Sequence, residues 1–431
     1  LFNKIPYFDE NVEISQYPDI PNNEFTRDEI LSMLAKEMLD AAELLPASQS
    51  EVGRIHKYIA LAYAAKIKLY QAYQQDETTH AVTSINKELL REVVSLCDQV
   101  TASNRYGLLD DFQGLDLVAN ENGKESVFAI QYSMNDGTES AGRINWSNLL
   151  NSPGGGSPYG GDGFFLPSQD LINAYQTDAN GLPDFNYQSK SDYSWAVLNN
   201  GVYTLQNTTP NVDPRLDFVV GRPTITWKTY PDKPCEGWVR DKETYGYNCA
   251  KRFWVSPESS DMFNGWPWGA SQLNWQIIRY ADILLWKAEA LIELNEGDGL
   301  ETARDLINQI RNRARNSAYV KDFNDHSKYA ANYLVNPYPA DVWNQDYARQ
   351  ALRWETRLEK ALEGERFFDL VRWGIVETTM NKYITAESDN RIYYANAHFT
   401  GGKDEYYPVP NNQYGFSGGK YVQNPGYAPF N

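Results

Sequence analysis

The sequence lacks the features that define several large classes of protein. Its 431 residues include only 3 cysteines, 5 methionines and 4 histidines. Basic residues are also scarce: 39 of them against 57 acidic residues give a net charge of −18, which would repel a phosphate backbone and excludes nucleic acid as a natural partner. No apolar run approaches the roughly 18 residues that a membrane-spanning helix needs, and the best stretch, residues 59–70, is interrupted by Lys66 and Lys68.

Catalytic and metal-binding motifs are missing as well. The sequence has no nucleophile elbow, no zinc-protease helix and no phosphate-binding loop, and the glycine cluster 154–163 lacks the lysine that such a loop requires. The histidines have no metal-ligand companion three or four residues away, and the acidic residues lack calcium-loop spacing. The sequence therefore predicts no enzyme, no metal site and no cofactor. The four histidines, expected to be surface or hydrogen-bonded residues, are His56, His80, His326 and His398.

One group of carboxylates needs separate consideration. Glu355, Glu359 and Glu363 are spaced by four residues and would stack along one helix face, where two of them could serve as an acid/base pair. Basic residues at 353, 357 and 360 interleave with them, which is typical of a solvated face of ion pairs. We therefore expect these glutamates to be exposed to solvent.

The cysteines allow one prediction of a cross-link. Cys235 and Cys249 flank a short loop rich in aromatic and charged residues, so a disulfide between them is possible in an oxidising compartment. Cys97 follows the helical period of its apolar neighbours and is predicted to be a buried free thiol.

Amphipathic periodicity predicts a mainly helical scaffold. Thr26 and Glu29 form a capping box that marks the start of the first helix. This helix should end before Pro46. In the predicted helix at 300–315 the apolar positions form a buried stripe. The arginines expected to face away from it are Arg304, Arg311, Arg313 and Arg315. The pairing of successive helices resembles tetratricopeptide repeats, although the period is irregular. The predicted segments are residues 26–45, 58–73, 86–100, 279–294, 300–315 and 346–373.

A different kind of segment separates the two helical blocks. Residues 101–278 contain turn signals, prolines and a few short alternating stretches, which predict a loop-rich lobe with short strands. Eight of the 12 tryptophans lie between residues 146 and 275, and loops on a rigid scaffold commonly carry binding groups. Flat rings can stack on the apolar faces of sugars. The predicted stacking residues are Trp146, Tyr159, Trp195, Trp227, Trp266 and Trp268.

Several longer motifs resemble the SusD/RagB family of outer-membrane nutrient-binding lipoproteins. The resemblance begins with the helix at 279–294 and its mate at 303–314, and it is most specific in the run RLEKALEGERFFDLVRWG at 357–374. Shorter matches are the LLP at 44–46, the DPRL at 213–216, the YPVP at 407–410 and the QNPGY at 423–427. The resemblance covers nearly the whole chain, and its motifs belong to the scaffold.

This resemblance implies a single SusD-like domain over residues 1–431. The helical scaffold would comprise residues 26–100 and 279–375, the lobe 101–278 would carry the ligand site, and residues 376–431 would be irregular. Family members have about a hundred or more residues before the point where this sequence begins, including a lipid-bearing cysteine. The resemblance also implies a lipid-anchored position at the outer-membrane cell surface and a TonB-dependent, SusC-like transporter as partner.

The residues and the resemblance together favour non-catalytic binding of a poly- or oligosaccharide and its delivery to the transporter. An oligopeptide cargo on the same fold is the alternative, because a peptide backbone would use polar grooves more than ring faces. A third hypothesis, an endo-acting glycosidase, would need two carboxylates flanking a sugar.

Overall fold

A computed structural model describes residues 1–139, 142–146, 151, 154, 156–200, 202–205, 210–228, 235, 237–265 and 268–430. It confirms the mainly helical fold class with few short strands. None of the helices in these ranges is long and apolar enough to cross a bilayer. The α-helices are α1 (Arg27–Leu44), α2 (Lys57–Ala72), α3 (Lys87–Ala102), α4 (Gln169–Ala174), α5 (Arg215–Val219), α6 (Lys242–Tyr245), α7 (Tyr280–Leu294), α8 (Gly299–Asn316), α9 (Gln345–Glu359), α10 (Arg366–Arg372), α11 (Val376–Ser388) and α12 (Asn411–Phe416).

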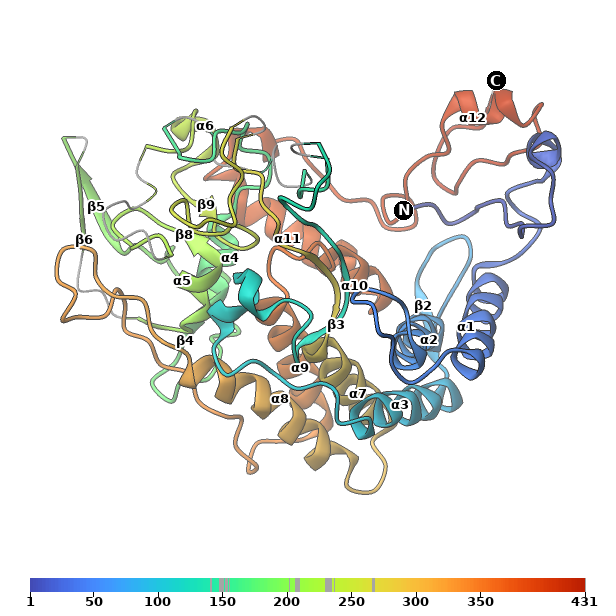
Figure 1. The fold of residues 1–431 in the computed structure, drawn as a ribbon, viewed down its shortest axis with the longest axis horizontal. Coiled ribbons are helices and arrows are strands. Elements are labelled where there is room, and N and C mark those ends of the chain that lie inside the picture. Colours follow the sequence, from blue (N-terminus) through green and yellow to red (C-terminus); the bar gives the residue numbers. More distant parts are fainter. Residues whose placement is uncertain are drawn as a thin grey trace.

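The scaffold is a stack of neighbouring helices. Thr26 and Glu29 form the predicted capping box of α1. Helix α1 packs on α2, α2 on α3, α3 on α7 and α7 on α8, so two blocks that are far apart in sequence become adjacent (Figure 1). Small residues permit this close packing: alanines 60, 62, 64 and 65 of α2 are all buried. The scaffold core also contains Cys97, a buried thiol as predicted, whose pKa is raised to about 12 by burial.

The predicted helix at 346–373 is in fact two helices. Helix α9 ends at Glu359, and α10 begins at Arg366 after a short turn. Leu362 and Gly364 in this turn have positive φ angles of 66° and 83°, which are incompatible with a continuous helix. The segment 376–431, expected to be irregular, begins with the 13-residue helix α11.

The strands form only two-stranded antiparallel ladders in the described ranges, so no large sheet underlies the lobe. The ladder of β3 with β10 pairs Trp275 with Ile130 and leads directly into α7, which ties the lobe to the scaffold. The strands are β1 (Tyr73–Gln75), β2 (Val82–Ile85), β3 (Ser126–Ile130), β4 (Gln176–Thr177), β5 (Ala196–Asn199), β6 (Val202–Leu205), β7 (Asn211–Val212), β8 (Val220–Gly221), β9 (Cys249–Ala250) and β10 (Trp275–Arg279).

The two ends of the chain run together as an arm that extends from the helical body (Figure 1). The amide of Tyr407 donates to the carbonyl of Leu1. Farther along, the Asn22 side chain donates to the carbonyl of Val422 and accepts from its amide, at 3.0 and 2.9 Å. In Figure 1 the arm lies on the opposite side of the scaffold from the lobe strands β5 and β6.

The expectation of a solvated glutamate face on α9 is wrong. Glu355 and Glu359 are completely buried, and the Glu363 side chain is only 7% exposed. Glu355 accepts hydrogen bonds from Arg215 at 2.6 Å and from Arg311 at 3.0 Å. The error has a physical reason: the basic residues that neutralise these glutamates do not come from α9 itself, apart from Lys360 at its end, but from distant segments.

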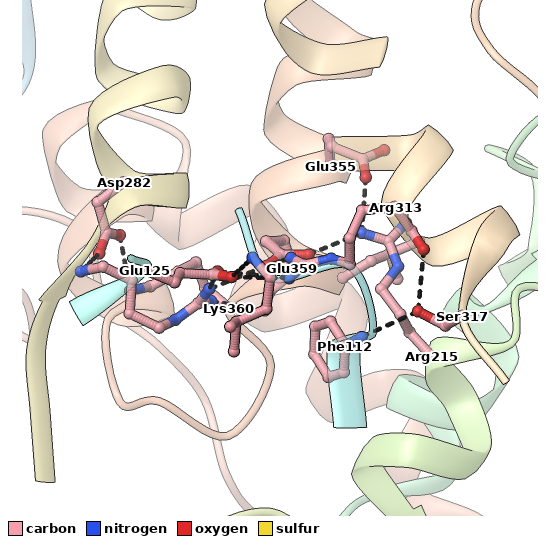
Figure 2. Close-up of polar contacts among 12 residues, drawn as sticks. Phe112, Glu125, Arg215, Asp282, Arg313, Ser317, Glu355, Glu359 and Lys360 are labelled. Atoms are coloured by element: carbon pink, nitrogen blue, oxygen red, sulfur yellow. Dashed lines mark hydrogen bonds and ion pairs between the residues drawn. The ribbon is translucent and has the colours of Figure 1, made fainter. Parts of the chain in front are cut away.

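Arg311 and Arg313 of α8 are likewise buried, although the sequence predicted that they face away from the core. Arg313 reaches Glu359 (Figure 2). Arg279 joins Glu359 to Glu125, at 3.0 and 2.8 Å. We call the connected set the ionic core. It comprises seven acidic and seven basic residues: Asp116, Glu125, Asp213, Asp282, Glu355, Glu359, Glu363, Arg215, Lys228, Arg252, Arg279, Arg311, Arg313 and Lys360.

Replacing Glu359 by glutamine tests the ionic core. The substitution keeps the shape of the side chain but leaves Arg215, Arg279 and Arg313 without their shared anion, so we expect the free energy of unfolding to fall by about 3–5 kcal/mol. Denaturant unfolding followed by circular dichroism measures it. The control is Asp346→Asn on the same helix, whose side chain is 94% exposed and should change stability by less than about 0.5 kcal/mol. Equal effects of the two variants would contradict the account.

The ionic core also predicts acid sensitivity. Burial alone would raise the pKa of Glu359, but Arg313, Arg279 and Arg215 outweigh burial and lower the pKa to about 2. Arg279 and Lys360 lower the pKa of Glu363 in the same way. Because these values lie below the pKa of about 4.3 in an unfolded chain, the stabilisation is present above pH 4.3 and is lost as the pH falls toward 2. Unfolding free energies measured between pH 6 and 2 should fall less steeply in Glu359→Gln than in the wild type; identical slopes would refute this assignment.

Candidate functional site

Two of the predicted stacking residues, Tyr159 and Trp227, are core residues. Tyr159 is fully buried and Trp227 is 1% exposed. The indole Nε1 of Trp227 donates to the Tyr159 hydroxyl at 2.9 Å, and that hydroxyl donates to the carbonyl of Val255 at 2.7 Å. With Trp238 and Trp254 they form a small separate core of the lobe. A lobe without long helices needs large rings to bury enough apolar surface, so the expectation that these two rings bind ligand is wrong.

The Trp195 side chain is half-buried. Its Nε1 donates to the carbonyl of Pro223 at 3.0 Å, and the Arg222 guanidinium lies 4.6 Å from its ring centroid. Two hydrogen bonds of 2.8 Å from Arg222 to the carboxylate of Asp217 fix the guanidinium in place. One face of the indole is therefore already occupied by a protein cation.

Two predicted rings are exposed. Trp268 is 56% exposed and Trp146 is 48% exposed. Trp268 lies in a hairpin whose ends are joined by a hydrogen bond from the amide of Phe263 to the carbonyl of Ala270 at 2.8 Å. The carbonyl of the next residue along the chain, Ser271, accepts from the amide of Asn145 at 2.8 Å. The two tryptophans are thus carried by neighbouring segments of the lobe. Trp266 lies outside the described residues.

A groove of about 800 Å³ opens at the base of the same hairpin, and we call it the lobe groove. Its walls come from the hairpin base, the turn after β8 and the segment after α8. Two short 3-10 turns, Phe112–Asp116 and Val118–Asn120, contribute the remaining wall. The lining residues are Gln113, Asp116, Leu117, Val118, Phe218, Thr226, Lys228, Lys251, Val255, Ser256, Glu258, Ser259, Asp261, Ala318, Tyr319, Val320, Lys321 and His326.

One tyrosine that the sequence analysis did not select lines the lobe groove, and two more lie beside it. Tyr319 lines it, and the rings of Tyr329 and Tyr333 lie 5.4 and 5.1 Å from the Tyr319 ring. Tyr329 is 55% exposed, and the Lys321 ammonium lies 3.9 Å from its ring centroid. The signal available in the sequence was three tyrosines within 15 residues in a loop, but the density of tryptophan elsewhere drew attention away from them.

The charged groups of the lobe groove balance one another. Its lining includes three lysines and three carboxylates, namely Lys228, Lys251, Lys321, Asp116, Glu258 and Asp261. The carboxylate of Asp116 accepts from Lys228 at 3.0 Å and from Arg252 at 3.1 Å. Burial opposes the ionisation of Asp116, but these two cations outweigh burial and hold its pKa below the usual value. Asp116 is thereby both a wall of the groove and a member of the ionic core.

Lys251 occupies an unusual position in the groove wall. Its ammonium donates to the backbone carbonyls of Asp217 and Thr226 at 2.6 and 2.9 Å, and burial lowers its pKa to about 7. These bonds tie the end of α5 to the turn after β8 and so fix one wall of the groove.

Two of the three carboxylates in the lobe groove are held by other side chains. Asp116 is held by two cations, and Asp261 accepts from Ser259 at 2.9 Å and from Gln272 at 2.6 Å. Glu121, whose pKa is raised to about 7 by burial, accepts from the amide of Asn274 and is not part of the groove lining. Within the described ranges no cluster of His, Cys, Asp and Glu could hold a metal ion.

The two cysteines of the predicted disulfide are free thiols in this structure, but they are neighbours in the lobe core. Both are buried, and the pKa of the Cys249 thiol is raised by burial and by its hydrogen bond with Cys235. Their oxidation to a disulfide stays a prediction.

Comparison with known proteins agrees with this architecture. The SusD family model matches residues 124–427, so the chain belongs to the SusD family. No match was found among curated proteins. A SusD-like protein of Bacteroides fragilis has a similar structure, with 21% identity, a TM-score of 0.64, and coverage of 99% of this chain and 76% of that one.

Two further similar structures have names that mention glycans. A laminarin-binding SusD-like protein shares 20% identity at a TM-score of 0.63, with 99% of this chain and 75% of that chain covered. Surface glycan-binding protein A of Bacteroides uniformis shares 18% identity at a TM-score of 0.60, with 98% and 73% covered. At these identities the likeness demonstrates a shared fold.

Two tryptophan substitutions separate core from surface. Trp227→Ala removes a buried ring and should lower the free energy of unfolding by about 3–5 kcal/mol, whereas Trp268→Ala removes an exposed ring and should change it by less than about 0.5 kcal/mol. Denaturant unfolding of both variants provides the test. A stability loss in Trp268→Ala as large as in Trp227→Ala would show that the hairpin ring is also structural.

Proposed function

We propose that the protein binds a poly- or oligosaccharide at the cell surface without cleaving it and delivers it to a TonB-dependent, SusC-like transporter. Membership of the SusD family supports carbohydrate binding, as do the names of the similar structures. The observation that carries the proposal is the lobe groove, which combines a volume of about 800 Å³ with the exposed Tyr329 beside its lining residues Tyr319 and Lys321. Lipid anchoring at the outer membrane and the transporter partner are parts of the proposal that follow from family membership.

The groove offers the two kinds of contact that a sugar chain requires. Exposed rings such as Tyr329 can cover the apolar face of a pyranose. Hydroxyl, amide and charged groups of the lining, among them Gln113 and Ser256, can hydrogen-bond the ring hydroxyls. Trp268, in the hairpin whose base includes the groove residue Asp261, is a second exposed ring that a longer chain could contact.

The charge balance of the groove favours an uncharged glycan. The three lysines do not outnumber the three carboxylates, and the lowered pKa of Lys251 reduces the positive charge further, so a polyanion gains no net attraction there. The net charge of −18 of the whole chain repels it at longer range. We therefore assign neutral polysaccharides as the cargo of the lobe groove.

The other two hypotheses have less support. An oligopeptide would be held chiefly through its backbone, and no unpaired strand edge lines the groove in the described residues. A glycosidase would need two carboxylates free to act on opposite sides of a sugar, whereas Asp116 and Asp261 are tied by other side chains and leave Glu258 as the one remaining carboxylate among the described lining residues.

Affinity gels containing neutral plant, algal, fungal or host polysaccharides test the proposal. Removing a stacking ring costs about 2 kcal/mol, so Tyr329→Ala and Trp268→Ala should each weaken retention of the retarding glycan roughly thirtyfold. Tyr407→Ala is the matched control, because Tyr407 is 62% exposed but lies on the terminal arm outside the groove.

Three results would contradict the proposal. The first is wild-type mobility in every neutral gel. The second is unchanged retention by both ring variants and their combination. The third is release of reducing sugar from the bound glycan, which would revive the glycosidase.

A further inference from the structure

A second cavity lies on the scaffold side of the lobe, and we call it the helix-entry pocket. It has a volume of about 360 Å³ and lies between the segment leading into α2, residues 105–106 and strand β3. It shares no lining residue with the lobe groove. The two cavities are nevertheless adjacent along the chain, because residues 113–118 line the groove and residues 122–131 line the helix-entry pocket.

The helix-entry pocket is positively charged although the chain as a whole is acidic. Arg54, Arg105 and Lys124 line it, and the only carboxylate among its lining residues is Glu51, which leaves an excess of two positive charges. The chain as a whole carries −18. A local excess of this sign attracts an anionic group that the rest of the surface repels.

The cations of the pocket are available to a ligand. Arg105 forms no ion pair with a carboxylate in the part of the chain that the structure describes; its neighbour is the Tyr106 hydroxyl. Lys124 pairs with Asp110 at 2.9 Å, but the Asp110 side chain is 98% exposed. Arg54 pairs with Glu51, and both side chains are 65% exposed. Exposed pairs of this kind contribute little stability and exchange readily for a ligand carboxylate.

A buried histidine orients the polar floor of the pocket. His56 is 8% exposed and lies 3.2 Å, through its Nε2, from the hydroxyl of Tyr106. Burial and the nearby Arg105 lower the pKa of His56, so the imidazole is neutral at pH 7 and its Nε2 can accept the Tyr106 proton. The Nδ1 atom of His56 has no hydrogen-bond partner among the described residues. This arrangement turns the lone pairs of the Tyr106 oxygen toward a donor such as Arg105 or a ligand hydroxyl.

The remaining walls suit a sugar ring. Val52 and Phe128 supply apolar surface, while Asn122 and Gln131 hydrogen-bond each other through their amides at 2.9 and 3.0 Å. The volume is at the lower end of the range of ligand pockets, about 300–1,000 Å³, which suits one or two sugar units and not a chain.

From this arrangement we infer that the helix-entry pocket binds a single uronic acid unit, with the sugar carboxylate on Arg105 and the ring against Phe128 and Tyr106. The choice of a sugar acid over other carboxylates rests on the proposed function.

Saturation-transfer NMR titrations with methyl glycosides test the inference. The ligands are the methyl glycosides of glucuronic, galacturonic and mannuronic acid, each compared with its neutral parent sugar and with sodium acetate at the same ionic strength. At least one uronide should bind ten times more tightly than its neutral parent and than acetate. Arg105→Gln should reduce that binding at least tenfold, and Arg91→Gln, which changes an exposed arginine of α3 outside the pocket, should leave it unchanged.

Each other outcome overturns the inference. Equal binding of uronide and neutral sugar excludes recognition of the carboxylate, equal binding of acetate indicates an adventitious anion only, and full binding by Arg105→Gln places the ligand elsewhere. Thermal melts of both variants check that folding is intact. The outcome is separable from that of the proposed function: Arg105→Gln should still be retained by the neutral glycan in affinity gels. If uronides bind but no polysaccharide retards the protein, the proposed function is wrong and the inference of a uronide-binding pocket stands.

Discussion

The buried ionic core is the interaction on which the rest of the structure depends. Glu359 near its centre accepts from Arg215 of α5 in the lobe, from Arg279 at the junction of β10 and α7, and from Arg313 of α8. Four segments that are far apart in sequence are thus joined through one carboxylate (Figure 2). Seven positive and seven negative groups cancel, which is the condition for burying so many charges. The arrangement fixes the lobe on the scaffold even though the lobe has only two-stranded ladders of its own.

The same network continues to the wall of the lobe groove. Glu363 binds Arg252, Arg252 binds Asp116, and Asp116 binds Lys228 in the groove lining. The lobe core of Tyr159, Trp227, Trp238 and Trp254 supports another side of the lobe. Tyr159 and Trp227, which the sequence analysis assigned to ligand binding, therefore provide rigidity, whereas Trp146 and Trp268 remain exposed. A rigid groove loses little conformational entropy when it binds, which would favour the proposed capture of a dilute polymer.

The sequence predicted the scaffold well because helix signals are local. The capping box of Thr26 and Glu29 and the apolar stripe at Ala303, Ile307 and Ile310 depend only on neighbouring residues, and the structure confirms them. It could not predict the burial of Glu355 and Glu359, because their partner Arg215 lies 140 and 144 residues away. Local spacing shows only that these glutamates share a helix face.

The candidate site was harder to predict for a related reason. Tryptophan density in a lobe is equally compatible with a core and with a binding surface, and only three-dimensional packing separates Trp227 from Trp268. The residues of the DPRL motif and of the run at 357–374 are the opposite case, because the sequence alone makes these motifs recognisable. They carry the family resemblance, and the structure shows that Asp213, Arg215, Glu359 and Glu363 serve the ionic core.

Hydrogen exchange with and without the glycan that retards the protein most strongly tests the central claim directly, namely that a rigid groove on the lobe captures the cargo. The account predicts slower amide exchange in segments 255–261 and 318–326, which contribute to the lobe groove, with no change in α1 or in the terminal arm. Protection that is absent from both groove segments and appears instead on α1 or on the arm would contradict it.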